Sequence, residues 1–138
     1  MTIKKAIFFS LIGLVLGILV FGGIFFFTAF QKPASDKKEE KIYTYSIGEL
    51  YANINESRRI LKVNITVETK DEKIHQALDK NKSKIINNIL ELIRSKTEED
   101  LAGNAGQQLL QKEILEIIQS IVPTEKITNV YFIEFIIQ

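Results

Sequence analysis

A long uncharged stretch near the N-terminus most constrains what this chain can fold into. The 25 residues from Ala6 to Phe30 carry no charge, and lysines stand on both sides of them. As an α-helix the stretch would reach about 37 Å, which is enough to cross a hydrocarbon core of about 30 Å with some tilt. It is longer than the apolar region of a cleaved signal peptide, and no Ala-x-Ala-like site follows it. We therefore expect a retained transmembrane helix over residues 6–30, preceded by a short tail over residues 1–5.

Two further features of this stretch bear on function. Gly13 and Gly17 form a G-x-x-x-G pair, a spacing that lets two membrane helices approach closely. Glycine is also common in membrane helices without any such role, so the pair fits a helix that only anchors the chain at least as well as one that packs against another helix. The stretch contains no ionisable side chain, and ion or proton pathways through membranes need such groups. We do not expect this chain alone to conduct or pump ions.

The remainder of the chain divides into a linker and one domain. Residues 31–41 contain Pro33 and a mixed run of charges, which predicts a solvated linker beside the lipid bilayer. Residues 42–138 suffice for one small core. Lys4, Lys5 and the terminal amine favour a cytoplasmic N-terminus, whereas the lysines of the linker argue for the reverse. We expect the N-terminus in the cytoplasm, because a short tail before the first apolar segment is the usual layout of a signal anchor.

Composition excludes several classes of function. The chain has 18 basic and 17 acidic residues, so no excess of positive charge predicts binding to nucleic acid. Cysteine is absent, which excludes a disulfide framework, thiolate catalysis and Cys-ligated zinc.

Periodicity predicts the elements of the domain. Residues 60–67 alternate between apolar and polar side chains, as in a strand with one wet face, and residues 42–47 predict a weaker strand that extends at most to Tyr51. Residues 74–94 show helical spacing, with Asp71 as the expected N-cap. Gly103 and Gly106 are expected to bracket a break before a second helix over about 107–121, which Pro123 ends.

The last segment, 127–138, is strand-like and rich in β-branched and aromatic residues. Strict alternation makes both of its faces apolar, so we expect it at the centre of the sheet or covered on its second face. The order strand, strand, helix, helix, strand predicts an α+β domain with two main helices on an antiparallel or mixed sheet.

No residue pattern indicates chemistry. His75 is the single histidine, and beside a helix start it is expected to be a solvated cap residue. Thr97 and Asp100 have the form of a capping box, and Glu98 and Glu99 between them indicate an exposed helix start better than a metal site. We therefore expect no enzyme activity, no metal site and no cofactor.

Glu134 stands out because it lies inside an apolar run. A central strand would require a partner for this carboxylate, such as Arg58, Arg59, a lysine or a backbone donor, and a salt bridge could form within the domain or across subunits. An edge or surface position is the alternative.

Four segments resemble a known family in the right order. Residues 130–138 resemble the V-Y-F-T-E-F-V-I-Q ending of FliL proteins, which are basal-body accessories of the bacterial flagellum. Residues 59–63 are similar to the family's R-Y-L-K-V, 96–101 to K-T-x-E-D-L, and 106–114 to G-x-x-x-L-x-x-E-I. One departure is the sequence S-K-I-I-N at 83–87, where the family often has P-x-I-R-D. The Arg–Asp pair of that family pattern is replaced by Ile86 and Asn87 in this chain.

The resemblance implies a periplasmic domain similar to the SPFH/stomatin domain, held at the bacterial inner membrane. It implies a homo-oligomeric ring around the stator units of the flagellar motor, supporting stator assembly or torque generation, with the MS ring of the basal body as a further partner. Such a protein works through interfaces. Our candidate interface residues are Gly13, Gly17, Arg58, Arg59, Lys62, Thr97, Glu98, Asp100 and Glu134.

Two alternatives remain open at this point. An anchored assembly factor of another envelope complex would have the same topology and different partners. A membrane-tethered sensor of a small ligand or lipid would need a sizeable apolar pocket with a few convergent polar groups.

Overall fold

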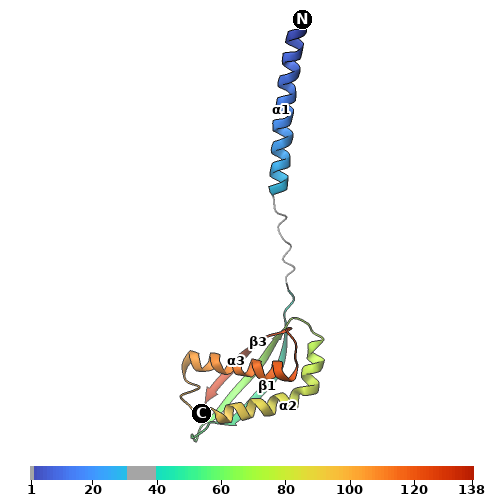
Figure 1. Cartoon of the computed structure of the whole chain (residues 1–138). Coiled ribbons are helices and arrows are strands. Elements are labelled where there is room, and N and C mark those ends of the chain that lie inside the picture. The colour runs from blue at the N-terminus through green and yellow to red at the C-terminus, as the bar shows by residue number, and fades with distance from the viewer. Residues whose placement is uncertain (1, 31–39) are drawn as a thin grey trace. The chain divides into compact units, whose positions relative to one another are not determined.

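The computed structural model describes residues 2–30 and 40–138, which form two units that are treated separately below. Figure 1 shows the chain from its N-terminal helix to the C-terminal strand. Of the predicted linker over residues 31–41, only Glu40 and Lys41 lie within the described residues.

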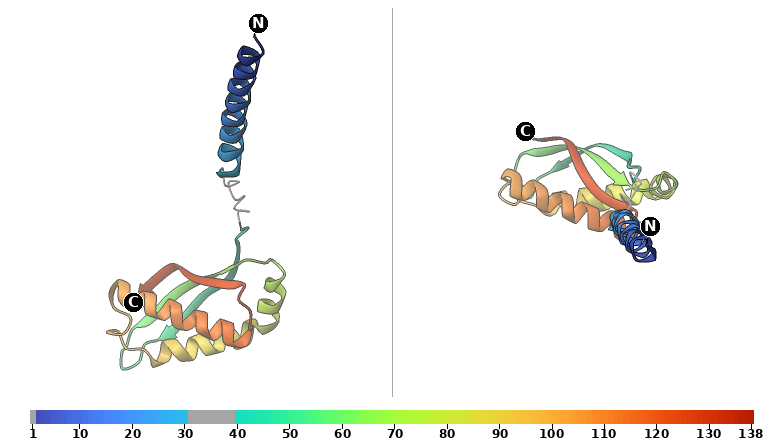
Figure 2. Two further views of the ribbon diagram at one scale, coloured as in Figure 1. Left: turned by 45° about the horizontal axis from the view of Figure 1, so that its top comes forward. Right: turned by 90° about the horizontal axis from the view of Figure 1, so that it is seen from above.

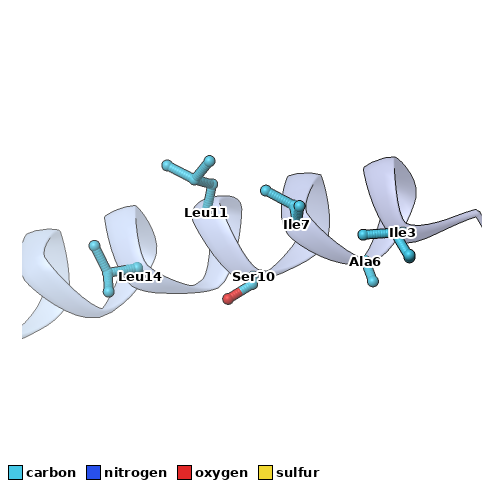
Figure 3. Close-up of a pocket in the computed structure, with 6 residues that line it drawn as sticks. All are labelled: Ile3, Ala6, Ile7, Ser10, Leu11 and Leu14. Atoms are coloured by element: carbon cyan, nitrogen blue, oxygen red, sulfur yellow. The ribbon is translucent and has the colours of Figure 1, made fainter.

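The first unit is a single helix, α1, over Ile3–Phe30. Its side chains from residue 3 to residue 28 are exposed, and the segment Ile3–Thr28 is long and apolar enough to cross a membrane. A shallow depression runs along one side of the helix near its start (Figure 3), lined by Ile3, Ala6, Ile7, Ser10, Leu11 and Leu14. A helix that is apolar on all sides needs lipid or other helices around it.

The second unit is an α+β domain in two layers. Its elements in chain order are β1 (Tyr43–Asn53), β2 (Ile60–Thr69), α2 (Ile74–Ser95), α3 (Gly103–Ile121) and β3 (Ile127–Ile137). The sheet is antiparallel with the order β1-β2-β3, so β2 is central. Both helices cover the same face of the sheet, as Figure 2 shows from two sides. The predicted fold class is confirmed.

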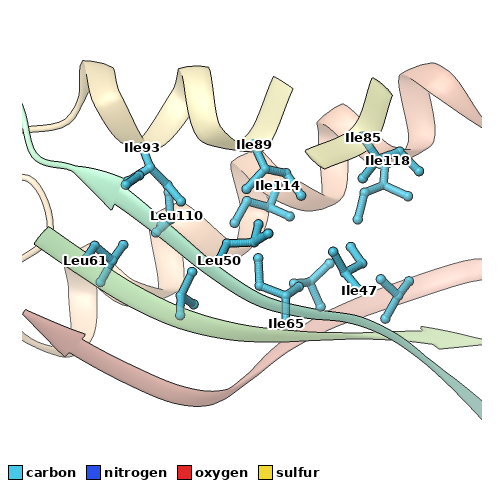
Figure 4. Close-up of a cluster of buried hydrophobic side chains, with 14 of the residues drawn as sticks. Ile47, Leu50, Leu61, Ile65, Ile85, Ile89, Ile93, Leu110, Ile114 and Ile118 are labelled. Atoms are coloured by element: carbon cyan, nitrogen blue, oxygen red, sulfur yellow. The ribbon is translucent and has the colours of Figure 1, made fainter. Parts of the chain in front are cut away.

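The core lies between the helices and the sheet. β2 alternates as predicted, with Leu61, Val63, Ile65 and Val67 fully buried. The helices contribute stripes at helical spacing, and in Figure 4 the labelled side chains of both layers point toward one another. The buried members of these stripes are Leu78, Ile85, Ile89 and Ile93 from α2, and Leu110, Ile114 and Ile118 from α3.

The first strand is longer than predicted. A β-bulge within it changes which residues face the core, so the alternating pattern of the sequence does not continue across the bulge. Ser46 pairs with Thr66 and Gly48 pairs with Ile65, so Ile47 is an extra residue in β1. Gly48 has φ +102°, a conformation that residues with side chains rarely adopt. After the bulge the buried positions continue at Leu50 and Ala52. Simple alternation therefore fails to indicate the second half of the strand.

A second bulge corrects the prediction for the last strand. β3 is an edge strand and not a central one. Phe132 pairs with Ile65 and Glu134 with Asn64, which leaves Ile133 as the extra residue. Before the bulge Val130 and Phe132 face the helices, and after it Phe135 does. The strand has one apolar face, which lies toward the helices, and the bulge at Ile133 changes which residues belong to it. Strict alternation had instead predicted two apolar faces.

The start of α2 is as predicted, whereas its cap and the start of α3 differ from the prediction. α2 begins at Ile74, and Asp71 lies three residues earlier, where its Oδ1 accepts a hydrogen bond from the Lys73 backbone N–H (2.9 Å). Asp71 therefore caps the turn that leads into α2. α3 begins at Gly103 and not near residue 107, so Gly103 and Gly106 lie in its first turn and do not bracket a break.

Gly106 permits a close approach between α3 and the loop before it. A Cβ at this position would lie 2.6 Å from the Asp100 carbonyl oxygen and 2.6 Å from the Leu101 carbonyl carbon. Both are backbone atoms, which cannot rotate away. Gly106→Ala is therefore expected to lower the free energy of unfolding by about 1–3 kcal/mol, although alanine is the better helix former. Urea unfolding of the full chain in a mild detergent measures this. Asn104→Ala, in the same turn but exposed, is the control, and an unchanged Gly106→Ala midpoint would contradict the expectation.

Candidate interaction surfaces

Several predicted residues gather at one end of the domain, which we call the distal end. It comprises the β1–β2 turn (54–59), the α2–α3 connection (96–102) and Gln138, and it lies at the opposite end of the sheet from Tyr43, where the domain begins. Backbone hydrogen bonds join these parts. The Asn55 N–H donates to the Lys96 carbonyl (2.8 Å), and Ile60 and Gln138 exchange a reciprocal pair of hydrogen bonds at 2.8 and 3.0 Å.

The predicted capping box is present in the α2–α3 connection. The Thr97 backbone N–H donates to Asp100 Oδ2 (2.9 Å), and the Asp100 N–H donates to Thr97 Oγ1 (3.2 Å). The hydrogen bond from the Thr97 backbone N–H to the ionised carboxylate is the main cause that holds the pKa of Asp100 below its usual value. The two residues therefore stabilise a tight turn before α3, and both remain at the surface.

Three further predicted residues, Arg58, Arg59 and Glu98, also lie at the distal end. Glu98 accepts hydrogen bonds from Ser57 Oγ and from Arg59 Nη1 (3.3 Å). It thereby ties the β1–β2 turn to the α2–α3 connection, although the two segments are far apart in the sequence. Arg58 is exposed. A polar depression at this end is lined by Asn55, Glu56, Ser57, Thr97, Glu98 and Glu99.

The second surface is the face of the sheet opposite the helices, which we call the outer sheet face. Lys62 Nζ on β2 lies 2.8 Å from Glu134 Oε2 on β3 and 3.9 Å from Glu49 Oε1 on β1. The contact with Glu134 raises the pKa of Lys62. A lysine partner for Glu134 is therefore present within the domain, although Glu134 itself lies on an edge strand and not on a central one.

A second polar group lies on the outer sheet face nearer to Tyr43. Glu68 accepts hydrogen bonds from Thr128 Oγ1 (2.6 Å) and from the Tyr131 hydroxyl (2.8 Å). These two donors lower the pKa of Glu68 and so keep its carboxylate charged. Because the donors come from β3, the pairing of two distant strands creates this group, and no local sequence signal indicates it.

The structure also corrects the expectation for His75. It is half-buried and not a solvated cap: its Nε2 lies 3.2 Å from Oγ1 of the fully buried Thr69. Its ring centroid lies 5.4 Å from that of Tyr45. The Tyr45 hydroxyl donates to Asp79 Oδ1 (2.5 Å). Sequence reasoning missed this cluster, because its members come from β1, β2 and α2.

Tyr45 makes the stability of the domain sensitive to high pH. Burial, followed by the hydrogen bond to Asp79, raises the pKa of Tyr45 to about 12 from its usual 10. Because the raised pKa favours the protonated phenol in the folded state, its contribution is complete below pH 10 and is lost as the pH rises toward 12. Unfolding titrations of Tyr45→Phe should show a shallower loss of stability across this window than the unchanged protein. The exposed Tyr51→Phe should change the slope much less, and equal slopes for Tyr45→Phe and the unchanged protein would refute the role of this hydroxyl.

Within the parts of the chain that the structure describes, no group of three metal-ligating side chains is present. Gly13 and Gly17 lie on α1 with open space where a Cβ would stand. The described residues thus present surfaces for contact: an apolar helix, a polar distal end and an outer sheet face.

Comparison with known proteins agrees with this description. The family model for the flagellar basal body-associated protein FliL matches residues 44–138. A flagellar protein FliL of Aquifex aeolicus is 34% identical over 77 residues, covering 56% of this chain and 48% of that protein. A flagellar protein FliL of Bacillus subtilis is 24% identical over 110 residues, covering 78% of each. The match to the Aquifex protein therefore spans about half of that protein's length.

Proposed function

Because the chain belongs to the FliL family of flagellar basal body-associated proteins, which are non-enzymatic, we propose that it is a membrane-anchored accessory of the flagellar motor. In this role it forms a homo-oligomeric ring around the stator units and supports their assembly or torque generation. The observation that carries the proposal is the family match over nearly the whole domain. The match favours a flagellar partner over the alternative of another envelope complex. The depression at the distal end is lined by polar residues and open to solvent, which suits contact better than the alternative of a ligand sensor.

In this proposal α1 spans the bacterial inner membrane, with residues 1–5 in the cytoplasm and residues 42–138 in the periplasm. The length and apolar character of α1 support the anchor. Gly13 and Gly17 provide a side of α1 where a second membrane helix can pack closely, since neither carries a side chain.

The distal end is the proposed binding surface for a stator subunit or for the MS ring. Arg58, Arg59 and Asp100 are exposed there. The hydrogen bonds of Glu98 hold the two segments of this end together, and the Thr97–Asp100 box fixes the turn within one of them. A partner would thus meet a preorganised polar surface, which reduces the entropy lost on binding.

Site-specific cross-linking in living cells tests this function. The chain contains no cysteine, so each single-cysteine variant reports from one position. Arg58→Cys places the reporter on the distal end, and Ser120→Cys places it at the opposite end of α3 as a matched exposed control. We expect adducts with a stator or MS-ring subunit from Arg58→Cys and not from Ser120→Cys. Adducts from both positions with non-flagellar envelope proteins alone would overturn the proposed function.

A further inference from the structure

The outer sheet face is the one face of the described sheet that no helix of the domain covers (Figure 2). A wet face of an antiparallel sheet is ordinarily polar, as β2 is here. On β3, however, three apolar or aromatic side chains point outward: Tyr131 is 40% exposed, Ile133 68% and Ile136 42%. The bulge at Ile133 turns the second half of the strand so that Ile136 faces outward as well. Such a strip on an edge strand is typical of a contact surface.

The outer sheet face is also acidic. The three strands together carry three carboxylates, those of Glu49, Glu68 and Glu134, and one ammonium, that of Lys62. All four side chains belong to the polar groups described above, so their charges are held in place. Two copies of this face would repel one another. A partner for the face should therefore present a surface with an excess of positive charge.

The outward side of α2 meets this requirement. Lys80, Lys84 and Arg94 are exposed on the helix away from its buried stripe, and they outnumber the two exposed carboxylates of α2, Asp79 and Glu91. The two surfaces also match in length. The 22 residues of α2 extend about 33 Å, and a strand of 11 residues extends about 36 Å. A helix lying along a sheet is also how this domain covers its own inner face (Figure 4).

We propose that the outer sheet face of one copy of this chain binds the outward side of α2 of a second copy. The contact is head-to-tail, because each copy uses a different surface on its two sides. Each pair therefore retains one free sheet face and one free α2, so that further copies add until a ring closes. This inference rests on the proposed homo-oligomer and specifies which surfaces form it.

Thiol cross-linking of the purified full chain in a mild detergent tests the arrangement. Ile133→Cys and Lys84→Cys each place one thiol, on the outer sheet face and on α2 respectively, and a bismaleimide of short span joins thiols that come close. We expect little dimer from either variant alone, one dimer band when the two are mixed, and a ladder from the chain that carries both. Efficient dimer from Ile133→Cys alone would show a face-to-face contact and overturn the inference.

Matched variants test the charge and the choice of helix. Lys80→Glu should lower the yield of mixed dimer about tenfold, whereas Lys112→Glu on α3 should leave it unchanged. Leu109→Cys, an exposed apolar position on α3, should give no product with Ile133→Cys. A product with Leu109→Cys in place of Lys84→Cys would move the contact to α3 and overturn the inference.

The outcomes of this cross-linking of the purified chain can be distinguished from the outcomes of the cross-linking in cells that tests the proposed function. Self-cross-links through other surfaces, together with flagellar adducts from Arg58→Cys, would refute this contact and leave the motor role standing. The predicted ladder without flagellar adducts would establish the contact and refute the motor role.

Discussion

Replacing Ile65 with alanine is expected to lower the free energy of unfolding of the domain by about 2–5 kcal/mol. Ile65 lies on the central strand, where both neighbouring strands pair with it, and it is fully buried beneath the helices. Both flanking strands change phase beside this residue, since it pairs with Gly48 on one side and Phe132 on the other. The surrounding backbone is therefore held from both sides and can collapse little into the cavity.

Urea unfolding of the full chain in a mild detergent, followed by circular dichroism, measures this change. Ile133→Ala is a matched control, because it makes the same substitution on the neighbouring strand at a side chain that is 68% exposed. In dilute monomer we expect this control to cost well under about 1 kcal/mol. Equal costs at the two positions would mean that Ile65 is not a core residue in the folded protein.

Removing residues 1–39 is expected to transfer the protein completely from the membrane fraction to the soluble fraction. α1 is the one helix among the described residues that is long and apolar enough to span a bilayer. The domain has its own core and forms a separate unit from residue 40 onward. The fragment 40–138 should therefore remain folded, with a urea midpoint close to that of the domain in the full chain.

Fractionation after a carbonate wash, with detection of the C-terminal domain, provides the measurement. A full chain in which Leu16 is replaced by alanine keeps the length of α1 and serves as the control that should stay in the membrane. A fragment that stays with the membrane would show that the domain has a second means of attachment. A fragment that is soluble but unfolded would show that α1 contributes to the fold of the domain.

Local sequence patterns account for much of this fold. The apolar stripe of α2 is predictable because residues three or four positions apart lie on one side of a helix. The strand β2 is predictable because every second residue lies on the same face of a strand. The Thr97–Asp100 box is also predictable from the local sequence, because both of its hydrogen bonds join residues three positions apart.

The candidate surfaces were only partly predictable. Arg59 and Glu98 were both predicted interface residues. Their contact joins residues 39 positions apart in the sequence, and no local sequence pattern indicates that such residues lie close together. The apolar surroundings of Glu134 indicated a partner of one of several kinds for a central strand, whereas the choice of Lys62 followed from strand pairing. Tyr45 and Asp79 were missed, because each alone is an ordinary strand or helix residue.

The sequence by itself determined the apolar span, the composition of the core, the order of the elements and the absence of any spacing that suits catalysis, because these depend on residues close together in the chain. The tertiary structure alone decided that β3 is an edge strand, that Ile133 faces outward, and that three strands bring Glu49, Lys62 and Glu134 together. A β-bulge reverses the faces of every residue that follows it, and its position depends on the partner strand. The outer sheet face therefore becomes visible only once the strands are paired.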